Sequence, residues 1–155
     1  MLRKKQVIDT RTAIEIAVQA LARRNYSKHE IKMKLLQQNC PDKILSEVML
    51  YLTERRYLDD SALANSILRS MLQDGKYGQM RIMLKMRQRG IPESIIQDVM
   101  RNFDPALELN AAIAITRKKF SVFNDSVKPQ IYRFLISRGF PSALISRVFD
   151  YLEYV

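Results

Sequence analysis

The middle of the chain carries three basic residues at four-residue steps, Arg81, Lys85 and Arg89. On a helix, residues four apart lie one above the other, so this spacing predicts a ridge of positive charge on one face. Ile82 and Met86 would lie on the opposite, buried face. Like charges stacked in this way destabilise a helix slightly, which hints that an external anion compensates them. The chemistry that this pattern predicts is anion binding.

Further basic residues extend the pattern on both sides of the ridge. The chain holds 26 Lys and Arg against 16 Asp and Glu, a net charge of +10 at pH 7. Such an excess favours a polyanionic partner: nucleic acid, an acidic protein groove or an anionic membrane surface. A solvated basic face without a partner stays the alternative for each residue. The candidate contact residues for a partner or DNA are Lys28, Lys32, Arg69, Lys76, Arg81, Lys85, Arg87, Arg89, Lys118, Lys119 and Arg133, and the same basic face would include Lys34, Arg117 and Arg138.

Residue types that catalyse reactions are scarce in this chain. His29 is the only histidine and Cys40 the only cysteine, and their different settings make a Cys–His pair a poor basis for catalysis. Asp59 and Asp60 could hold a metal, but neighbouring carboxylates at a helix start are more often caps. The segment from Gly75 to Gly78 lacks the Lys-Ser/Thr ending of a nucleotide phosphate loop. We therefore predict no catalytic residue, no metal site and no cofactor, and a protein that binds rather than catalyses.

The elements that would position the cations come from an internal repeat. Residues 26–48 align without a gap with residues 77–99, and residues 131–148 continue the series. In each copy an Asn or Gly stands where a helix should end, because these residues tolerate the left-handed conformation. An apolar residue and a proline suited to the first turn of the next helix follow it. The three junctions are Asn39-Cys40-Pro41, Gly90-Ile91-Pro92 and Gly139-Phe140-Pro141, whose middle residues we expect to be buried.

The predicted helix starts agree with this division. Ser27 and Glu30 match a capping box, Asp59 to Ser61 can cap the next repeat, and Asp104-Pro105 can start the third. Each copy also begins with an amphipathic segment of its own, so we expect nine helices. The prediction is an all-α protein of three tandem three-helix repeats in an elongated, curved array. The predicted boundaries are 1–58, 59–103 and 104–155, within one continuous repeat domain.

The cellular setting is predicted from what the sequence lacks. A single cysteine allows no internal disulfide, and no apolar run reaches the length of a membrane span. The start of the chain lacks the apolar segment of a secretory signal. We expect a soluble, cytoplasmic protein that does not associate with membranes.

With these residues laid out, the sequence resembles the RecX family, the bacterial regulators of the RecA recombinase. The features that carry the resemblance follow one another in family order over nearly the whole chain. Arg56 departs from it, because the family usually has Gly before Tyr-Leu-Asp-Asp, and Asn39-Cys40 replaces a more usual Gly-apolar pair. The matching segments are Ala-Leu-Ala-Arg-Arg-Asn-Tyr26-Ser27 with Glu30-Ile31 and Leu35, Tyr57-Leu58-Asp59-Asp60, Lys76-Tyr77-Gly78 with Arg81-Ile82, Arg89-Gly90-Ile91, and Arg138-Gly139-Phe140.

The resemblance implies a protein without a catalytic site that binds the RecA filament on single-stranded DNA. It would lie along the filament groove and block extension or promote disassembly, and so limit ATP-driven strand exchange and coprotease activity. It also implies a role in DNA repair, homologous recombination and the SOS response, and we expect a monomer. The alternative is a direct binder of single- or double-stranded DNA of helix-turn-helix type, although no helix shows the grouping of side chains suited to reading bases. A helical scaffold that binds neither is the third alternative.

Overall fold

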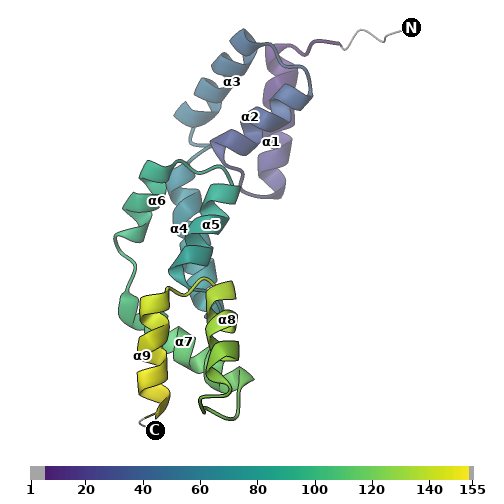
Figure 1. Ribbon diagram of the computed structural model, residues 1–155. Helices are drawn as coiled ribbons and strands as arrows, with labels where there is room; N and C mark the ends of the chain where they lie inside the picture. The colour runs from purple at the N-terminus through teal and green to yellow at the C-terminus, as the bar shows by residue number, and fades with distance from the viewer. Residues whose placement is uncertain (1–5, 154–155) are drawn as a thin grey trace, which may run out of the picture. The chain divides into compact units, whose positions relative to one another are not determined.

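A computed structural model describes residues 6–153 of the chain. These residues form nine α-helices and no strand, so the predicted all-α fold of three-helix repeats is confirmed (Figure 1). The outer ends of the first and third predicted repeats, residues 1–5 and 154–155, lie outside the described residues. The repeat boundaries and the elongated, curved shape stay predictions. The helices are α1 (Thr10–Arg23), α2 (Lys28–Gln37), α3 (Asp42–Glu54), α4 (Asp60–Asp74), α5 (Gln79–Gln88), α6 (Glu93–Met100), α7 (Pro105–Lys119), α8 (Lys128–Ser137) and α9 (Ser142–Glu153).

The contacts divide the described residues into two compact units. Unit 1 runs up to Ala64 and also contains Arg87–Ile95. Unit 2 contains Asn65–Met86 and the described residues from Ile96 onward. The first three helices thus fold together with the segment around the end of α5. The last three helices fold together with most of α4 and α5 and the second half of α6.

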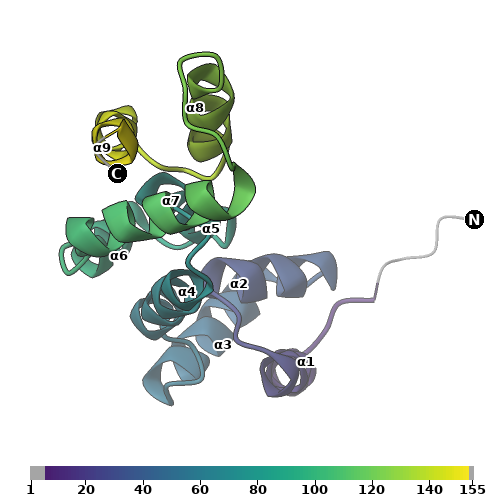
Figure 2. The ribbon, with the colours of Figure 1, turned by 90° about the horizontal axis from the view of Figure 1, so that it is seen from below.

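In unit 1, α1 packs mainly against α3, and α2 packs against both (Figures 1 and 2). Alanines at 13, 17 and 20 form the buried stripe of α1, and their small side chains allow its backbone to lie close to α3. Leucine, isoleucine and valine from the other two helices fill the space. The buried core consists of Ala13, Ala17, Ala20, Ile31, Leu35, Cys40, Leu45, Val48, Leu52 and Leu58.

In unit 2, α7 packs mainly against α9, and α8 packs against both. The buried stripe of α7 includes Thr116, whose hydroxyl donates to the Ala112 carbonyl at 2.7 Å. This bond satisfies the hydroxyl inside the core, because it uses a neighbouring main-chain acceptor. The buried core consists of Ala112, Ile113, Ile131, Leu135, Phe140, Leu144, Ile145, Val148 and Leu152.

The three predicted helix ends are confirmed. Asn39, Gly90 and Gly139 have φ values of 59°, 72° and 86°, in the left-handed region. The apolar residues that follow them, Cys40, Ile91 and Phe140, are buried as expected. Arg56 also has a φ of 59°, so a bulky residue occupies the left-handed position at the end of α3.

The predicted caps are confirmed as well. The Ser27 hydroxyl accepts the Glu30 amide at 3.0 Å, and the Glu30 carboxylate accepts the Ser27 amide at 2.9 Å. The Asp59 carboxylate accepts from the Ala62 amide, and the Asp104 carboxylate accepts from the Ala106 amide. None of the helices in residues 6–153 is long and apolar enough to cross a membrane.

Candidate binding surface and the joints that position it

The start of α5 is held by the main chain of the last repeat. The Gly78 amide donates to the Arg138 carbonyl at 2.9 Å, and the Met80 amide donates to the Gly139 carbonyl at 3.0 Å. A Cβ on Gly78 would lie 2.4 Å from the Gly139 oxygen, so only glycine permits this approach. These contacts hold the first turn of α5 in place, and with it the backbone that carries Arg81 and Lys85.

A buried carboxylate completes this joint. Glu108 on α7 is 2% exposed, and it accepts from the Gln79 amide at 2.7 Å and from the Gln79 side-chain amide at 3.1 Å. Burial raises the pKa of the Glu108 carboxyl above its ordinary value, although the two bonds from Gln79 oppose the shift. We did not predict this role from the sequence. The available signal was that Glu108 lies four residues before the buried Ala112, on the apolar stripe of its helix.

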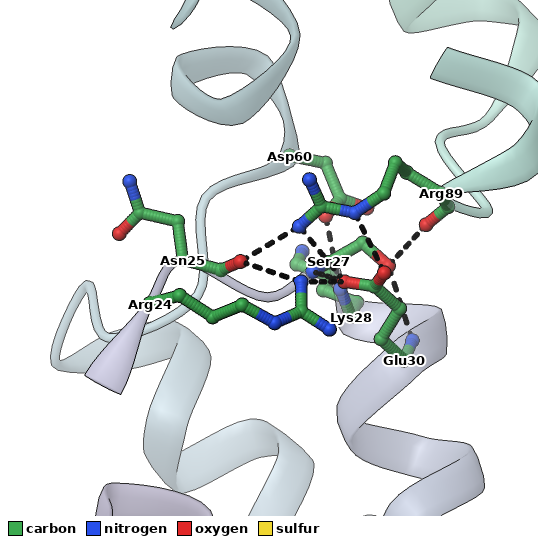
Figure 3. Close-up of polar contacts among 7 residues, drawn as sticks. All are labelled: Arg24, Asn25, Ser27, Lys28, Glu30, Asp60 and Arg89. Carbon is green, nitrogen blue, oxygen red and sulfur yellow. Dashed lines mark hydrogen bonds and ion pairs between the residues drawn. The ribbon is translucent and has the colours of Figure 1, made fainter. Parts of the chain in front are cut away.

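Unit 1 contains an equivalent joint at the start of α2 (Figure 3). The Ser27 hydroxyl donates to the Arg89 carbonyl, and the Lys28 amide donates to the Asp60 carboxylate at 2.9 Å. Asp60 is 4% exposed, so it serves this joint, while Asp59 caps α4. Ser27 aligns with Gly78 in the repeat and Arg89 aligns with Arg138, so both units use the same pair of positions.

Arg89 does not belong to an outward ridge, and the predicted ridge of Arg81, Lys85 and Arg89 is wrong at this residue. Its guanidinium contacts the Glu30 carboxylate at 2.6 and 3.1 Å and donates to the Asn25 carbonyl at 2.7 Å (Figure 3). The Arg89 side chain is only 20% exposed. It lies just after the end of α5, where the helix no longer dictates its direction, so the four-residue spacing does not apply.

Glu30 is the acidic centre of this network. Burial tends to raise its pKa, but the Arg89 and Ser27 hydrogen bonds and the charges of Arg89 and Arg24 outweigh burial. The pKa of the Glu30 carboxyl is therefore lowered from its ordinary value. Glu30 is ionised at neutral pH and neutralises Arg89, which makes Arg89 a structural residue.

The exposed face of α5 combines charge with apolar surface. Arg81 and Lys85 are exposed, as is Arg69 on α4. Met80 and Leu84, each one residue earlier, are 53% and 39% exposed. Apolar residues four apart lie on one side of a helix, so they form a stripe beside the two cations. The predicted buried face of Ile82 and Met86 is confirmed. The exposed stripe of Met80 and Leu84 was not predicted.

The remaining candidates have different surroundings. Arg87 donates to the Glu93 carboxylate at 2.9 and 2.8 Å, in an exposed pair. Lys32 in unit 1 and Arg133 in unit 2 are exposed, while Lys28 is half-buried. Unit 2 also brings Lys76, Lys118 and Lys119 around one cavity with Arg138. Whether the cations of both units form one continuous face stays a prediction.

The residues that could have supported catalysis have structural surroundings. His29 packs beside Gly90, where a Cβ on the glycine would lie 2.6 Å from the His29 ring. Cys40 is buried. Burial, and to a smaller extent the negative charge of Asp42, raises the pKa of the Cys40 thiol, which keeps the thiol protonated and unreactive. No group of three or more His, Cys, Asp or Glu side chains gathers anywhere in residues 6–153 as a metal site would require.

Comparisons with known proteins agree on one family. A family model described as "RecX, second three-helix domain" matches residues 59–100. The regulatory protein RecX of Prosthecochloris aestuarii is 30% identical over 148 residues, which cover 93% of this chain and 95% of that protein. The regulatory protein RecX of Pasteurella multocida is 24% identical over 147 residues, which cover 92% of this chain and 88% of that protein.

Solved structures share the fold. A crystal structure of RecX from Lactobacillus salivarius has a TM-score of 0.86 at 18% identity, and the match covers 95% of this chain and 98% of that one. A second crystal structure, of a regulatory protein RecX, has a TM-score of 0.80 at 23% identity, with 91% and 73% covered. These matches support the three-helix repeat architecture.

Proposed function

Because the chain belongs to the RecX family, we propose that it binds the RecA filament on single-stranded DNA and inhibits filament extension, ATPase, strand exchange and coprotease activity. Its relatives are named regulatory proteins. The proposed action is therefore binding without chemistry. A cytoplasmic location, a monomeric state and the repeat boundaries 1–58, 59–103 and 104–155 belong to the same proposal.

The observation that carries this proposal is the mixed character of the α5 face. Arg81 and Lys85 offer charge to phosphate or carboxylate groups. Met80 and Leu84 offer exposed apolar surface to a protein. Protein interfaces bury an apolar centre inside a polar rim, whereas binding to naked DNA is mainly a matter of phosphate contacts. A partner made of both protein and nucleic acid fits this face.

Direct binding to DNA is the second candidate, and the net charge of +10 favours it. In that case affinity for naked DNA would be high and would fall steeply with salt concentration. The exposed Met80 and Leu84 side chains would then have no role, because a phosphate backbone offers them no apolar contact. We therefore place this candidate second.

The test is the reversal of Arg81 and Lys85 to Glu in the full chain. Substoichiometric protein should lower the ATPase of RecA on single-stranded DNA and shorten filament lifetime, and the double variant should lose at least about tenfold in potency, an effect of about 1.4 kcal/mol. Reversing Lys43 and Arg147, exposed residues outside the candidate set, gives a control with the same change of charge. Circular dichroism checks that both variants stay helical. Equal potency of the two variants would remove the α5 face from the mechanism.

A further inference from the structure

Unit 2 contains a cavity of about 280 Å³ whose walls carry four cations. Lys76 comes from the turn between α4 and α5, Lys118 and Lys119 from the end of α7, and Arg138 from the end of α8. Ile115 and Phe134 supply apolar walls. The fold assembles this site from three separate segments. Its volume is close to the lower end of the range for small-molecule pockets, about 300 Å³.

Two of the four cations are held by aromatic rings. The Lys119 ammonium nitrogen lies 4.3 Å from the centre of the Phe134 ring. The Arg138 guanidinium carbon lies 5.4 Å from the same ring and 5.7 Å from the Tyr77 ring. A cation is attracted to the face of an aromatic ring, which limits the freedom of both side chains. The Arg138 main chain is fixed as well, because its carbonyl accepts the Gly78 amide.

The positive charge in this cavity is largely uncompensated. Lys76 lies 3.7 Å from the Asp74 carboxylate in an exposed pair. Within residues 6–153, no carboxylate lies within ion-pair distance of Lys118, Lys119 or Arg138. Like charges around one cavity repel each other, so an anion bound among them lowers the energy of the site.

We propose that this cavity binds one nucleotide, with its phosphate among the four cations and its sugar or base against Ile115 and Phe134. Arg and Lys side chains are the usual partners of phosphate, and an aromatic wall suits a base. A glutamate or aspartate side chain would use the cations but leave the apolar walls without a partner. The inference rests on the proposed function, in which the single strand of the filament supplies the nucleotide. A free nucleotide has the same chemistry and is the other source to distinguish.

Binding is measured by two-dimensional ¹H–¹⁵N NMR of the full chain without RecA. The probes are a short oligothymidylate, thymidine 5′-monophosphate and a polyglutamate peptide. We expect the oligothymidylate to shift the amide signals of Lys118, Lys119 and Arg138. Equal saturation by the mononucleotide would identify free nucleotide as the source, and binding of the oligomer alone would identify the strand. Stronger shifts with polyglutamate, or no shift at these amides, would overturn the proposal.

The matched variants are Lys118→Ala with Lys119→Ala, and Lys43→Ala with Arg147→Ala as a control of equal charge. The first pair should weaken oligothymidylate binding at least about tenfold and reduce the salt slope by about 0.7, the value for the single phosphate that the cavity holds. Equal weakening by the control pair would show that binding depends only on the net charge of the protein, and it would refute the proposed site. If the first pair fails to fold, Arg138→Gln tests the same cavity while keeping the main-chain carbonyl. The binding measurement contains no RecA, so the two proposals are tested separately. If the wild-type chain binds oligothymidylate in this cavity but does not inhibit RecA in the ATPase assay, the proposed function is refuted and the nucleotide site is not.

Discussion

The Arg89 guanidinium lies 2.6 Å from the carboxylate of Glu30, a residue 59 positions earlier in the chain. The pair joins the end of α5 to the start of α2, and the Arg89 carbonyl accepts the Ser27 hydroxyl at the same joint. One residue thus contributes both its side chain and its main chain to holding unit 1 together. The charge of Arg89 is used inside the protein.

Replacing Arg89 with Ala should lower the free energy of unfolding by about 1.5–3 kcal/mol, the usual contribution of hydrogen bonds to charged groups. The loss arises because Glu30 stays partly buried without its main partner. Arg87→Ala is the matched control, since it removes only the exposed pair with Glu93 and should cost less than about 1 kcal/mol. Urea unfolding of both variants measures the difference. Equal losses would contradict the structural role of Arg89.

The pH dependence of stability should change when Glu108 is replaced by Gln. The raised pKa of Glu108 means that folding favours its protonated form. Its contribution to stability is therefore complete below the ordinary carboxyl pKa and is lost as the pH rises through the raised value. The Gln side chain can still accept the Gln79 amide but does not ionise, so the variant should gain stability relative to the wild type as the pH rises above the ordinary carboxyl pKa of about 4.5. Urea unfolding at several pH values tests this, and a constant difference between the two proteins would refute it.

Arg56 occupies a left-handed position at the end of α3, with a φ of 59°. A side chain there costs the folded protein about 1–2 kcal/mol. Glycine removes this cost, but it loses more conformational entropy on folding, which cancels part of the gain. Arg56→Gly should therefore stabilise the protein by about 0.5–1 kcal/mol. Arg55→Gly is the control, because Arg55 has an ordinary φ of −86° and gains nothing from glycine. A rise in the midpoint of thermal unfolding for Arg56→Gly alone is the expected result, and a fall would contradict the strain.

Gly78 and Gly75 allow a paired test of the joint in unit 2. A Cβ on Gly78 would collide with the Gly139 main chain, whereas a Cβ on Gly75 would meet nothing within 4 Å. Gly78→Ala should therefore open the bonds from the amides of residue 78 and Met80, at a cost of about 1–3 kcal/mol. Gly75→Ala should leave them closed, although its φ of 66° strains the variant. Hydrogen exchange at these two amides is the measurement, and unchanged protection in Gly78→Ala would show that the joint tolerates a side chain.

The helices, their caps and their ends could be predicted from the sequence because these features are local. A helix end depends on residues within a few positions, as at Asn39, Gly90 and Gly139. The amphipathic segment expected at the start of the first copy is likewise present as α1, whose buried stripe packs within its own repeat.

The joints could not be predicted in the same way, because they connect residues far apart in the chain. Ser27 and Arg89 are 62 positions apart, and Gln79 and Glu108 are 29 apart. The spacing of basic residues shows which helix face they share. It does not show that Arg89, which lies beyond the end of α5, pairs with Glu30. The buried Asp60 and the cation cavity of unit 2 likewise depend on packing between separate segments.

The contacts of Gly78 and Met80 with Arg138 and Gly139 consist of amides and carbonyls alone. Every amino acid except proline has both groups. Gly78 must be glycine because it lies close to the Gly139 main chain. The other contacts at this joint are made by the main chain, so they do not restrict which side chains occupy the outward positions. The exposed positions of α5 and α8 are therefore open to change during evolution, so a lineage could adjust which partner it recognises without rebuilding its architecture.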